Sequence, residues 1–259
     1  MVRKSGRRLV SAVALLSAIA LTAGCGDSAE SAEAGRKPGP ATSTAAGEAA
    51  QHSEPLTAAR LKAALLTADQ AVGFEITMRS SRDGSEPDSS RDVKETVSPK
   101  ACQHVKEANR SDGEEAAAAS SIMYVAGTSL TPRSTSLMSY SEEAARARMK
   151  QLREAVGVCS RFSFSNTYGK ASATIEVLDV PALGDDALRY RTLFAFDNGG
   201  FSWILVTAVR VGGVIATMNV QTVTGPMPPG KLDTFKPDPG PDEAVIATLI
   251  ENVTKAQST

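Results

Sequence analysis

The sequence predicts an α+β domain: an antiparallel sheet that ends in a three-strand meander, with helices packed on one face. The first reason is that residues 188–223 form three consecutive stretches with the apolar alternation of strands. The second is the pair of breaks at 197–200 (Asp-Asn-Gly-Gly) and 212–213 (Gly-Gly), because both supply residues that short hairpin turns require. The third is the helical spacing of apolar residues in two flanking segments, which begin near Ser141 and Pro241.

The two turns also predict a register for the meander. The break at 197–200 pairs Phe196 with Phe201, and the Gly-Gly turn pairs Val211 with Val214. Alternate side chains then point to one side, which we expect to be the core face. Its members are Tyr190, Thr192, Phe194, Phe196, Phe201, Trp203, Leu205, Val209, Val211, Val214, Ala216, Met218 and Val220.

The opposite face of the meander mixes apolar side chains with a few polar ones, which suits a partly covered ligand groove. The alternative interpretation is an ordinary exposed sheet face beneath a loop or helix. Under the groove hypothesis the ligand-binding residues are Arg189, Arg191, Ile204, Val206, Asn219 and Gln221.

Local signals predict the elements that precede the meander. Thr57 can cap a first helix, and Gly73 marks the passage into a strand near 74–78. The segment 80–92 is polar and predicted to be a loop. The Ser-Pro pair at 98–99 suits the start of a second helix.

The middle of the chain contains one segment whose secondary structure the sequence does not decide. Residues 111–119 are acidic and then alanine-rich, which fits either a helical extension or a loop. Strands are predicted over 122–128, 134–140 and 172–177. A strong helix is predicted to begin at Ser141-Glu142-Glu143 and to end at Gly157. The last helix is predicted to bury Val245, Ile246, Leu249, Ile250 and Val253.

The N-terminus resembles a bacterial lipoprotein signal. Residues 3–8 contain four basic side chains, 9–20 are apolar, and Gly24 precedes Cys25. By this resemblance residues 1–24 are a signal peptide, and Cys25 becomes the first mature residue and carries a diacylglycerol thioether. The expected partner is therefore a membrane, reached through the lipid anchor. The alternative is plain secretion with cleavage elsewhere.

Composition divides the rest of the chain into a tether and a domain. Residues 25–54 are small and polar with no apolar period, which is typical of a flexible tether. Residues 55–257 are long enough for one domain with its own core. Removing residues 1–24 takes away four of the 28 basic residues and none of the 29 acidic ones, so the net charge becomes −5. The chain therefore lacks the excess of positive charge that would indicate nucleic-acid binding.

The three cysteines predict one disulfide. With Cys25 lipidated, Cys102 and Cys159 remain as an even pair in an oxidising compartment. Each lies in or next to a predicted helix, so the disulfide would join the two helices. Two free buried thiols are the alternative.

The sequence contains no recognisable motif for catalysis, metal binding or cofactor binding. The domain holds a single histidine, His104, and no Gly-x-Ser-x-Gly elbow or phosphate loop. Cys102 and His104 are two residues apart, but no second ligand pair follows. We therefore expect no catalytic residue, no metal and no cofactor.

The order of these features resembles one known family. The chain begins with an anchor, a tether and a leading helix. A cysteine before two strands follows, then a charged helix ending at a second cysteine, and last a Trp-bearing meander with a terminal helix. This order is similar to that of the PknH-like extracellular sensor domains of actinobacterial receptor kinases and their lipoprotein relatives. Those domains more often have four cysteines in two disulfides, and this chain has one pair.

The resemblance implies ligand sensing in a groove on the extracytoplasmic face of the cell membrane, without catalysis. The ligand would be a small molecule, glycan or lipid, and an envelope protein is a further possible partner. The alternative function is a carrier of lipid or envelope precursor with a mainly apolar cavity.

Overall fold

The computed structural model describes residues 54–84, 95–107, 114–127, 131–167, 169–228, 230–231 and 242–258. All of them belong to the second of two compact units of the chain, Glu48–Thr259. The predicted signal peptide, Cys25 and nearly all of the predicted tether lie outside the described residues.

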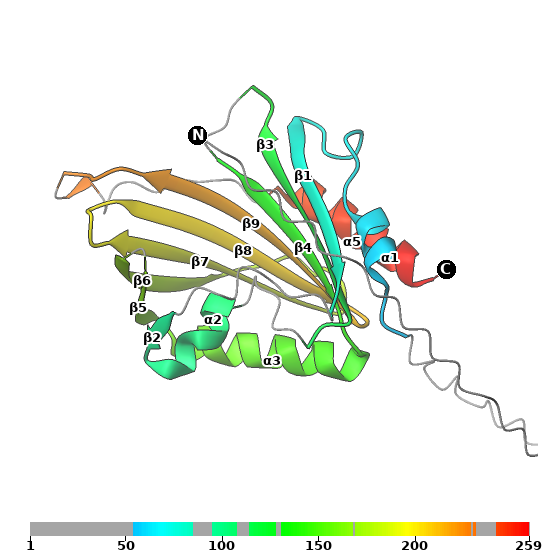
Figure 1. Ribbon diagram of the computed structural model, residues 1–259, viewed down its shortest axis with the longest axis horizontal. Helices are drawn as coiled ribbons and strands as arrows, with labels where there is room; N and C mark the ends of the chain where they lie inside the picture. Colours follow the sequence, from blue (N-terminus) through cyan, green and yellow to red (C-terminus); the bar gives the residue numbers. More distant parts are fainter. Residues whose placement is uncertain are drawn as a thin grey trace, which may run out of the picture. The chain divides into compact units, whose positions relative to one another are not determined.

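One antiparallel sheet of nine strands organises the domain, in the order β1-β3-β4-β9-β8-β7-β6-β5-β2 (Figure 1). The α+β class and the C-terminal meander of β7, β8 and β9 are confirmed. The strands are β1 Phe74–Asp83, β2 Thr96–Ser98, β3 Ala117–Val125, β4 Arg133–Ser139, β5 Arg161–Asn166, β6 Gly169–Leu178, β7 Asp186–Phe196, β8 Phe201–Val211 and β9 Val214–Thr224.

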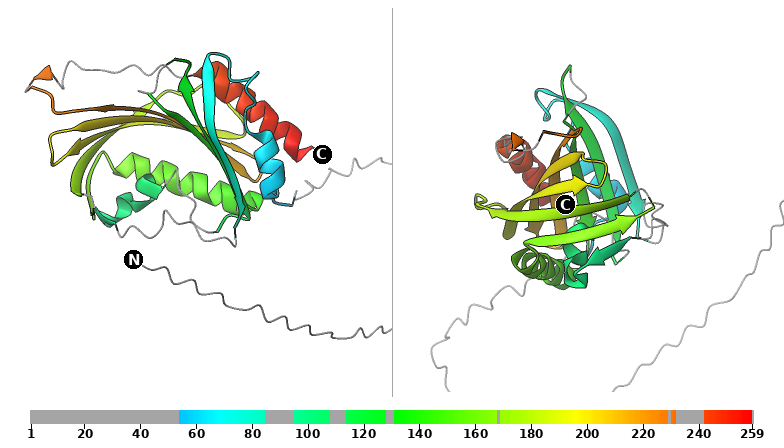
Figure 2. Two further views of the ribbon diagram at one scale, coloured as in Figure 1. Left: turned by 45° about the horizontal axis from the view of Figure 1, so that its top comes forward. Right: turned by 90° about the vertical axis from the view of Figure 1, so that its left-hand side faces the viewer.

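Helices lie on both faces of this sheet, so the prediction that they pack on one face is wrong. Figure 2 shows α3 (Glu142–Val158) inside the curve of the sheet, while α1 (Ala58–Ala64) and α5 (Glu243–Gln257) lie outside it. We call the side of α3 the inner face and the side of α5 the outer face. The short helix α2 (Gln103–Glu107) joins α3 on the inner face.

Strand β8 shows why helices cover both sides. Its outer-face residues Leu205 and Val209 belong to one buried cluster, with α1 and α5. Its inner-face residues Val206 and Ala208 belong to another, with α2 and α3. A strand that is apolar on both faces needs cover on both, and this is why its sequence is a nearly continuous apolar run.

The predicted disulfide is confirmed, and it lies within the inner-face core. Cys102 and Cys159 are bonded with their Cα atoms 5.5 Å apart, and both are buried. Cys102 ends a 3₁₀ turn (Lys100–Cys102) before α2, and Cys159 caps the C-terminus of α3. The bridge therefore fixes α2 against the end of α3.

Capping residues start two of the helices as predicted. The Thr57 side chain accepts a hydrogen bond from the Arg60 backbone N–H, and Ser141 accepts one from Ala144. The last helix buries the five residues expected of it.

Two segments of the N-terminal half differ from prediction. Strand β1 continues to Asp83, so residues 80–83 are strand where a loop was expected. The alanine-rich end of 111–119 starts β3, which is neither of the two alternatives. Alanine is a weak strand former, and here pairing with both β1 and β4 decides the conformation.

Candidate functional site

The hairpin between β8 and β9 has the predicted register. Val211 pairs with Val214 across the Gly212-Gly213 turn, and Gly212 has a positive φ of 53°. A Cβ atom on Gly213 would lie 2.4 Å from the Tyr140 carbonyl oxygen, so only glycine fits where this turn meets the start of α3.

The hairpin between β7 and β8 is shifted by one residue from the prediction. Ala195, not Phe196, lies opposite Phe201. The loop closes with the Phe196 N–H donating to the Gly200 carbonyl at 2.9 Å, and Gly199 takes a φ of 82°. This is the geometry of a three-residue loop with a glycine bulge, whereas the prediction assumed four loop residues.

The shift reverses β7 relative to β8 and β9, because alternate residues of a strand point to opposite faces. Arg191 lies opposite Leu205 and so shares the outer face with Trp203. The prediction that one face unites the six ligand-binding residues is therefore wrong. Arg189 and Arg191 lie on the outer face, and Ile204, Val206, Asn219 and Gln221 lie on the inner face.

Both arginines have carboxylate partners on the outer face. Arg189 donates through Nε to Thr207 Oγ1 at 2.9 Å, and its two terminal nitrogens bind the Glu243 carboxylate at 2.7 and 3.1 Å. Arg191 pairs with Glu176. Arg189 thus fixes the start of α5 to the sheet, and its role in this structure is structural.

A row of hydroxyl groups crosses the inner face from the edge of the sheet toward its centre. The pairing places Ser80 of β1 opposite Ser120 of β3, Ser120 opposite Ser136 of β4, and Ser136 opposite Thr217 of β9. Ser80 Oγ and Ser120 Oγ are 2.8 Å apart and share a hydrogen bond. We refer to these four residues as the hydroxyl row.

Two amide side chains extend this polar surface along β9. Asn219 donates through Nδ2 to Ser134 Oγ at 3.3 Å, and Gln221 donates through Nε2 to Ser202 Oγ at 3.1 Å. Asn219 and Gln221 are half-buried. In β3, β4 and β9, all of which the structure describes, no charged side chain is on the inner face.

Four buried polar atoms on the inner face of the sheet have no hydrogen-bond partner among the described residues: Tyr190 Oη, Thr217 Oγ1, Asn219 Oδ1 and Arg210 Nε. The first three belong to uncharged side chains, whereas Arg210 binds Asp185 through Nη1. Tyr190 is 1% exposed and Thr217 is fully buried. Burial raises the pKa of the Tyr190 phenol, so its hydroxyl stays protonated. Leaving such groups unpaired costs about 1–3 kcal/mol each.

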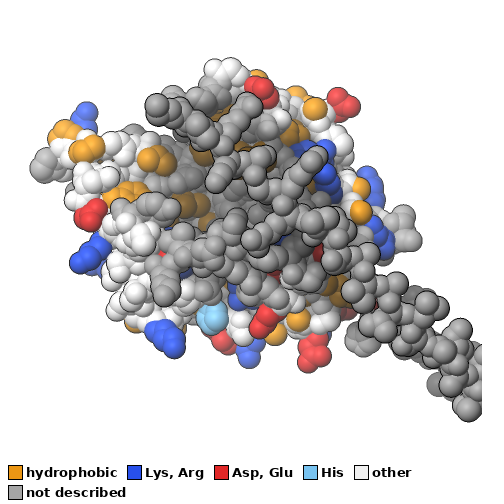
Figure 3. Space-filling model, in the orientation of Figure 1, with side chains coloured by type: hydrophobic (Ala, Val, Ile, Leu, Met, Phe, Trp, Pro, Cys, Tyr) orange, Lys and Arg blue, Asp and Glu red, His pale blue; other side chains and the backbone are white. Residues whose placement is uncertain are grey.

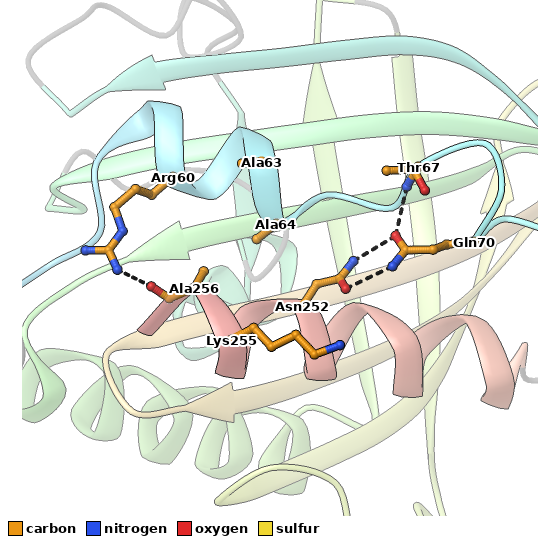
Figure 4. A pocket seen from close by; sticks show the side chains of 8 residues that line it. All are labelled: Arg60, Ala63, Ala64, Thr67, Gln70, Asn252, Lys255 and Ala256. Atoms are coloured by element: carbon orange, nitrogen blue, oxygen red, sulfur yellow. Dashed lines mark hydrogen bonds between the residues drawn. The ribbon is translucent and has the colours of Figure 1, made fainter. Parts of the chain in front are cut away.

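Two pockets lie elsewhere among the described residues, away from the inner-face polar surface. One of about 360 Å³ lies between α1 and α5 (Figure 4). There Gln70 and Asn252 exchange two hydrogen bonds of 3.0 and 2.9 Å, and Arg60 donates to the Ala256 carbonyl. These side chains hydrogen-bond within the protein itself, so the pocket is part of the packing contact between α1 and α5.

A second pocket, of about 500 Å³, opens on the outer face of β5, β6 and β7. Its lining includes Arg161, Ser163 and Leu193, which share the outer face of these strands.

The described residues contain no group of three or more His, Cys, Asp or Glu side chains placed to hold a metal ion. His104, the one histidine among the described residues, is exposed close to the disulfide, and Figure 3 shows a histidine side chain at the surface. Among the same residues, no helix is both long and apolar enough to span a membrane.

Of the polar residues predicted to bind a ligand, Asn219 and Gln221 lie on the inner face. The sequence analysis did not identify the hydroxyl row. Ser80 was assigned to a loop, and the row depends on pairing between strands that are far apart in sequence. The alternation of Ser134 and Ser136 was the available signal, since it marks a polar face of a strand.

Comparison with known proteins gives a structural match. No family model matches the sequence, and no curated protein matches it. The extracellular domain of PknH from Mycobacterium tuberculosis superposes with a TM-score of 0.51 at 14% identity, over 78% of this chain and 99% of that domain. The chain has the fold of the PknH extracellular domain.

A second structure, the Rv0999 ortholog from Mycobacterium smegmatis, matches with a TM-score of 0.41 at 14% identity, over 75% of this chain and 96% of that one. The first of these matches, with a TM-score of 0.51, confirms at the level of fold the resemblance to the PknH extracellular domain that the order of elements indicated.

Proposed function

We propose that this protein is a non-enzymatic lipoprotein, anchored through Cys25 on the extracytoplasmic side of a membrane, that binds or senses a ligand on the inner face of its sheet. The lipoprotein-like N-terminus supports the anchor. The fold supports the location, because the matched PknH structure is an extracellular domain.

The observation that carries the binding proposal is the set of unpaired buried atoms: Tyr190 Oη, Thr217 Oγ1 and Asn219 Oδ1. Buried polar groups are nearly always paired in folded proteins, so these three uncharged exceptions on one face call for a partner from outside the chain. Two of these residues, Tyr190 and Asn219, lie in a single cross-strand row on either side of Val206. A bound ligand that hydrogen-bonds to these atoms would recover the desolvation cost.

The same surface favours sensing over the alternative of a lipid carrier. A carrier needs a mainly apolar lining, whereas the inner-face positions of β4 and β9 include Ser134, Ser136, Thr217, Asn219 and Gln221. The large apolar side chains of this face, such as Phe162 and Phe194, pack in the core together with α2 and α3.

Native mass spectrometry of the protein extracted from its own envelope tests the proposal. We expect a co-purified species on the parent protein that is lost from Thr217→Val, because that change removes one unpaired hydroxyl without changing side-chain shape. Arg191→Ala is the matched control. Its side chain is on the outer face, so it should keep the species and change stability by about 0.5 kcal/mol or less.

Two results would count against binding at this face. One is a protein that carries no bound species after gentle extraction. The other is a species that Thr217→Val retains as firmly as the parent does.

A further inference from the structure

We infer that the ligand of the inner face is an uncharged, hydroxyl-rich molecule, a neutral oligosaccharide. This inference depends on the proposed function, since it names the class of ligand for the same surface. It is based on the spacing of the hydroxyl row, the hydrogen-bonding capacity that is left free, and the distribution of charge between the two faces.

The hydroxyl row has the reach of an oligosaccharide. Ser80, Ser120, Ser136 and Thr217 lie on four neighbouring strands. Neighbouring strands are about 4.8 Å apart, so the row spans roughly 14 Å. A ligand that presents hydroxyl groups at regular intervals along an extended chain can follow such a row.

The free hydrogen-bonding capacity of the site matches hydroxyl groups better than anions. Asn219 uses its Nδ2 on Ser134, so its buried Oδ1 can only accept a hydrogen bond. A carboxylate or phosphate ester that is fully ionised has no proton to donate to it. Thr217 and Tyr190 can donate as well as accept, and a sugar hydroxyl also does both.

The charge distribution excludes the usual anchors of an anionic ligand. Of the three arginines of the meander, Arg189 and Arg191 lie on the outer face, where they bind Glu243 and Glu176. Arg210 lies on the inner face of β8, where it binds Asp185 and the Gly212 carbonyl. On the inner face, Arg82 of β1 pairs with the buried Glu115. An anion drawn into the hydroxyl row would thus lose hydration without gaining a free cation among the strands that form it.

Apolar side chains next to the hydroxyl row and to the amides of β9 suit the C–H surface of a sugar ring. Ile122 of β3 lies opposite Ser134, and Ile204 of β8 lies opposite Gln221. Both isoleucines are half-buried, so part of each side chain is available for contact. Polar groups that alternate with small apolar patches favour a ligand with both hydroxyl groups and C–H faces.

The test uses the whole mature chain with Cys25→Ser, which prevents acylation and keeps every other residue. Calorimetry would measure binding of three neutral probes, mannotetraose, maltotetraose and cellotetraose. Laurate and glucose 6-phosphate serve as acyl and anionic probes. We expect at least one tetrasaccharide to bind with a Kd below about 1 mM, and neither of the other probes to bind.

Two variants separate the class of ligand from the existence of the site. Thr217→Val should weaken tetrasaccharide binding about tenfold, as expected for one lost hydrogen bond. Asn219→Asp keeps an acceptor oxygen and adds a negative charge, so a neutral sugar should lose at most about threefold in affinity. An anionic ligand would lose far more.

The outcomes distinguish this inference from the proposed function. If no tetrasaccharide binds, or if binding ignores Thr217→Val, the ligand class is overturned. If laurate or glucose 6-phosphate binds instead and Thr217→Val weakens it, the inner face remains a binding site and only the class is wrong. If the envelope-derived species and every probe ignore both variants, the proposed function fails as well.

Discussion

Replacing Thr217 with valine is expected to stabilise the protein without ligand. Thr217 is fully buried between Ser136 of β4 and Ala208 of β8, and its Oγ1 has no partner among the described residues. Valine has the same shape and the same preference for strands, so the change removes a hydroxyl and leaves packing intact. The folded state then no longer bears the cost of an unpaired buried hydroxyl.

The size of the effect follows from that cost. An unpaired buried hydroxyl costs about 1–3 kcal/mol, and we expect Thr217→Val to recover about 1 kcal/mol because some solvent relaxation reduces the gain. For a domain of this size, 1 kcal/mol corresponds to a rise in Tm of about 2–4 °C. Urea unfolding should show a higher midpoint with an unchanged slope.

Thr207→Val is the matched control for this measurement. Thr207 is also buried in the meander, but its Oγ1 accepts a hydrogen bond from Arg189 Nε at 2.9 Å. Its replacement should destabilise the protein by about 1.5–3 kcal/mol, since it leaves a charged donor unpaired. If Thr217→Val is instead less stable than the parent, its hydroxyl has a partner and the reasoning about the inner face is refuted.

Three further predictions concern the anchor, the disulfide and the start of α5. Cys25→Ala should move the protein from the membrane fraction to the medium or leave an unprocessed precursor; normal processing with full membrane retention would contradict lipidation. Replacing Cys102 and Cys159 together by alanine should lower the free energy of unfolding by about 4 kcal/mol, from the chain-entropy model and their separation of 57 residues; alkylation of both thiols in unreduced native protein would contradict the bond. Glu243→Gln should cost about 1.5 kcal/mol, the low end for a charged hydrogen bond because the Glu243 side chain is 44% exposed. A double-mutant cycle with Arg189→Met measures the coupling, and a coupling near zero would show that the pair does not fix α5.

Turn chemistry explains which part of the meander the sequence could predict. A Gly-Gly pair between two apolar strands favours a two-residue turn, so the predicted β8–β9 register was correct. The Asp-Asn-Gly-Gly segment permits loops of different length, and a bulge at Gly199 selects the three-residue loop. One residue of difference was enough to move Arg191 to the opposite face.

The rest of the site depends on contacts that no local pattern contains. Ser80 and Thr217 belong to one row only because β1, β3, β4 and β9 are neighbours in the sheet. Helix periodicity predicted which side of α5 is buried, but it does not state which face of the sheet the helix covers. These relations come from the tertiary arrangement.

The pairing of β4 with β9 has a consequence for how the chain folds during synthesis. β4 ends at Ser139 and its partner β9 begins at Val214, so the N-terminal part of the sheet has an open edge until the last strand arrives. An open edge of this kind is an aggregation hazard, and pairing between distant strands is slow. We therefore expect the meander, whose strands are joined by short turns, to form first and then capture β4. A chain truncated before β9 would leave that edge permanently exposed to other chains.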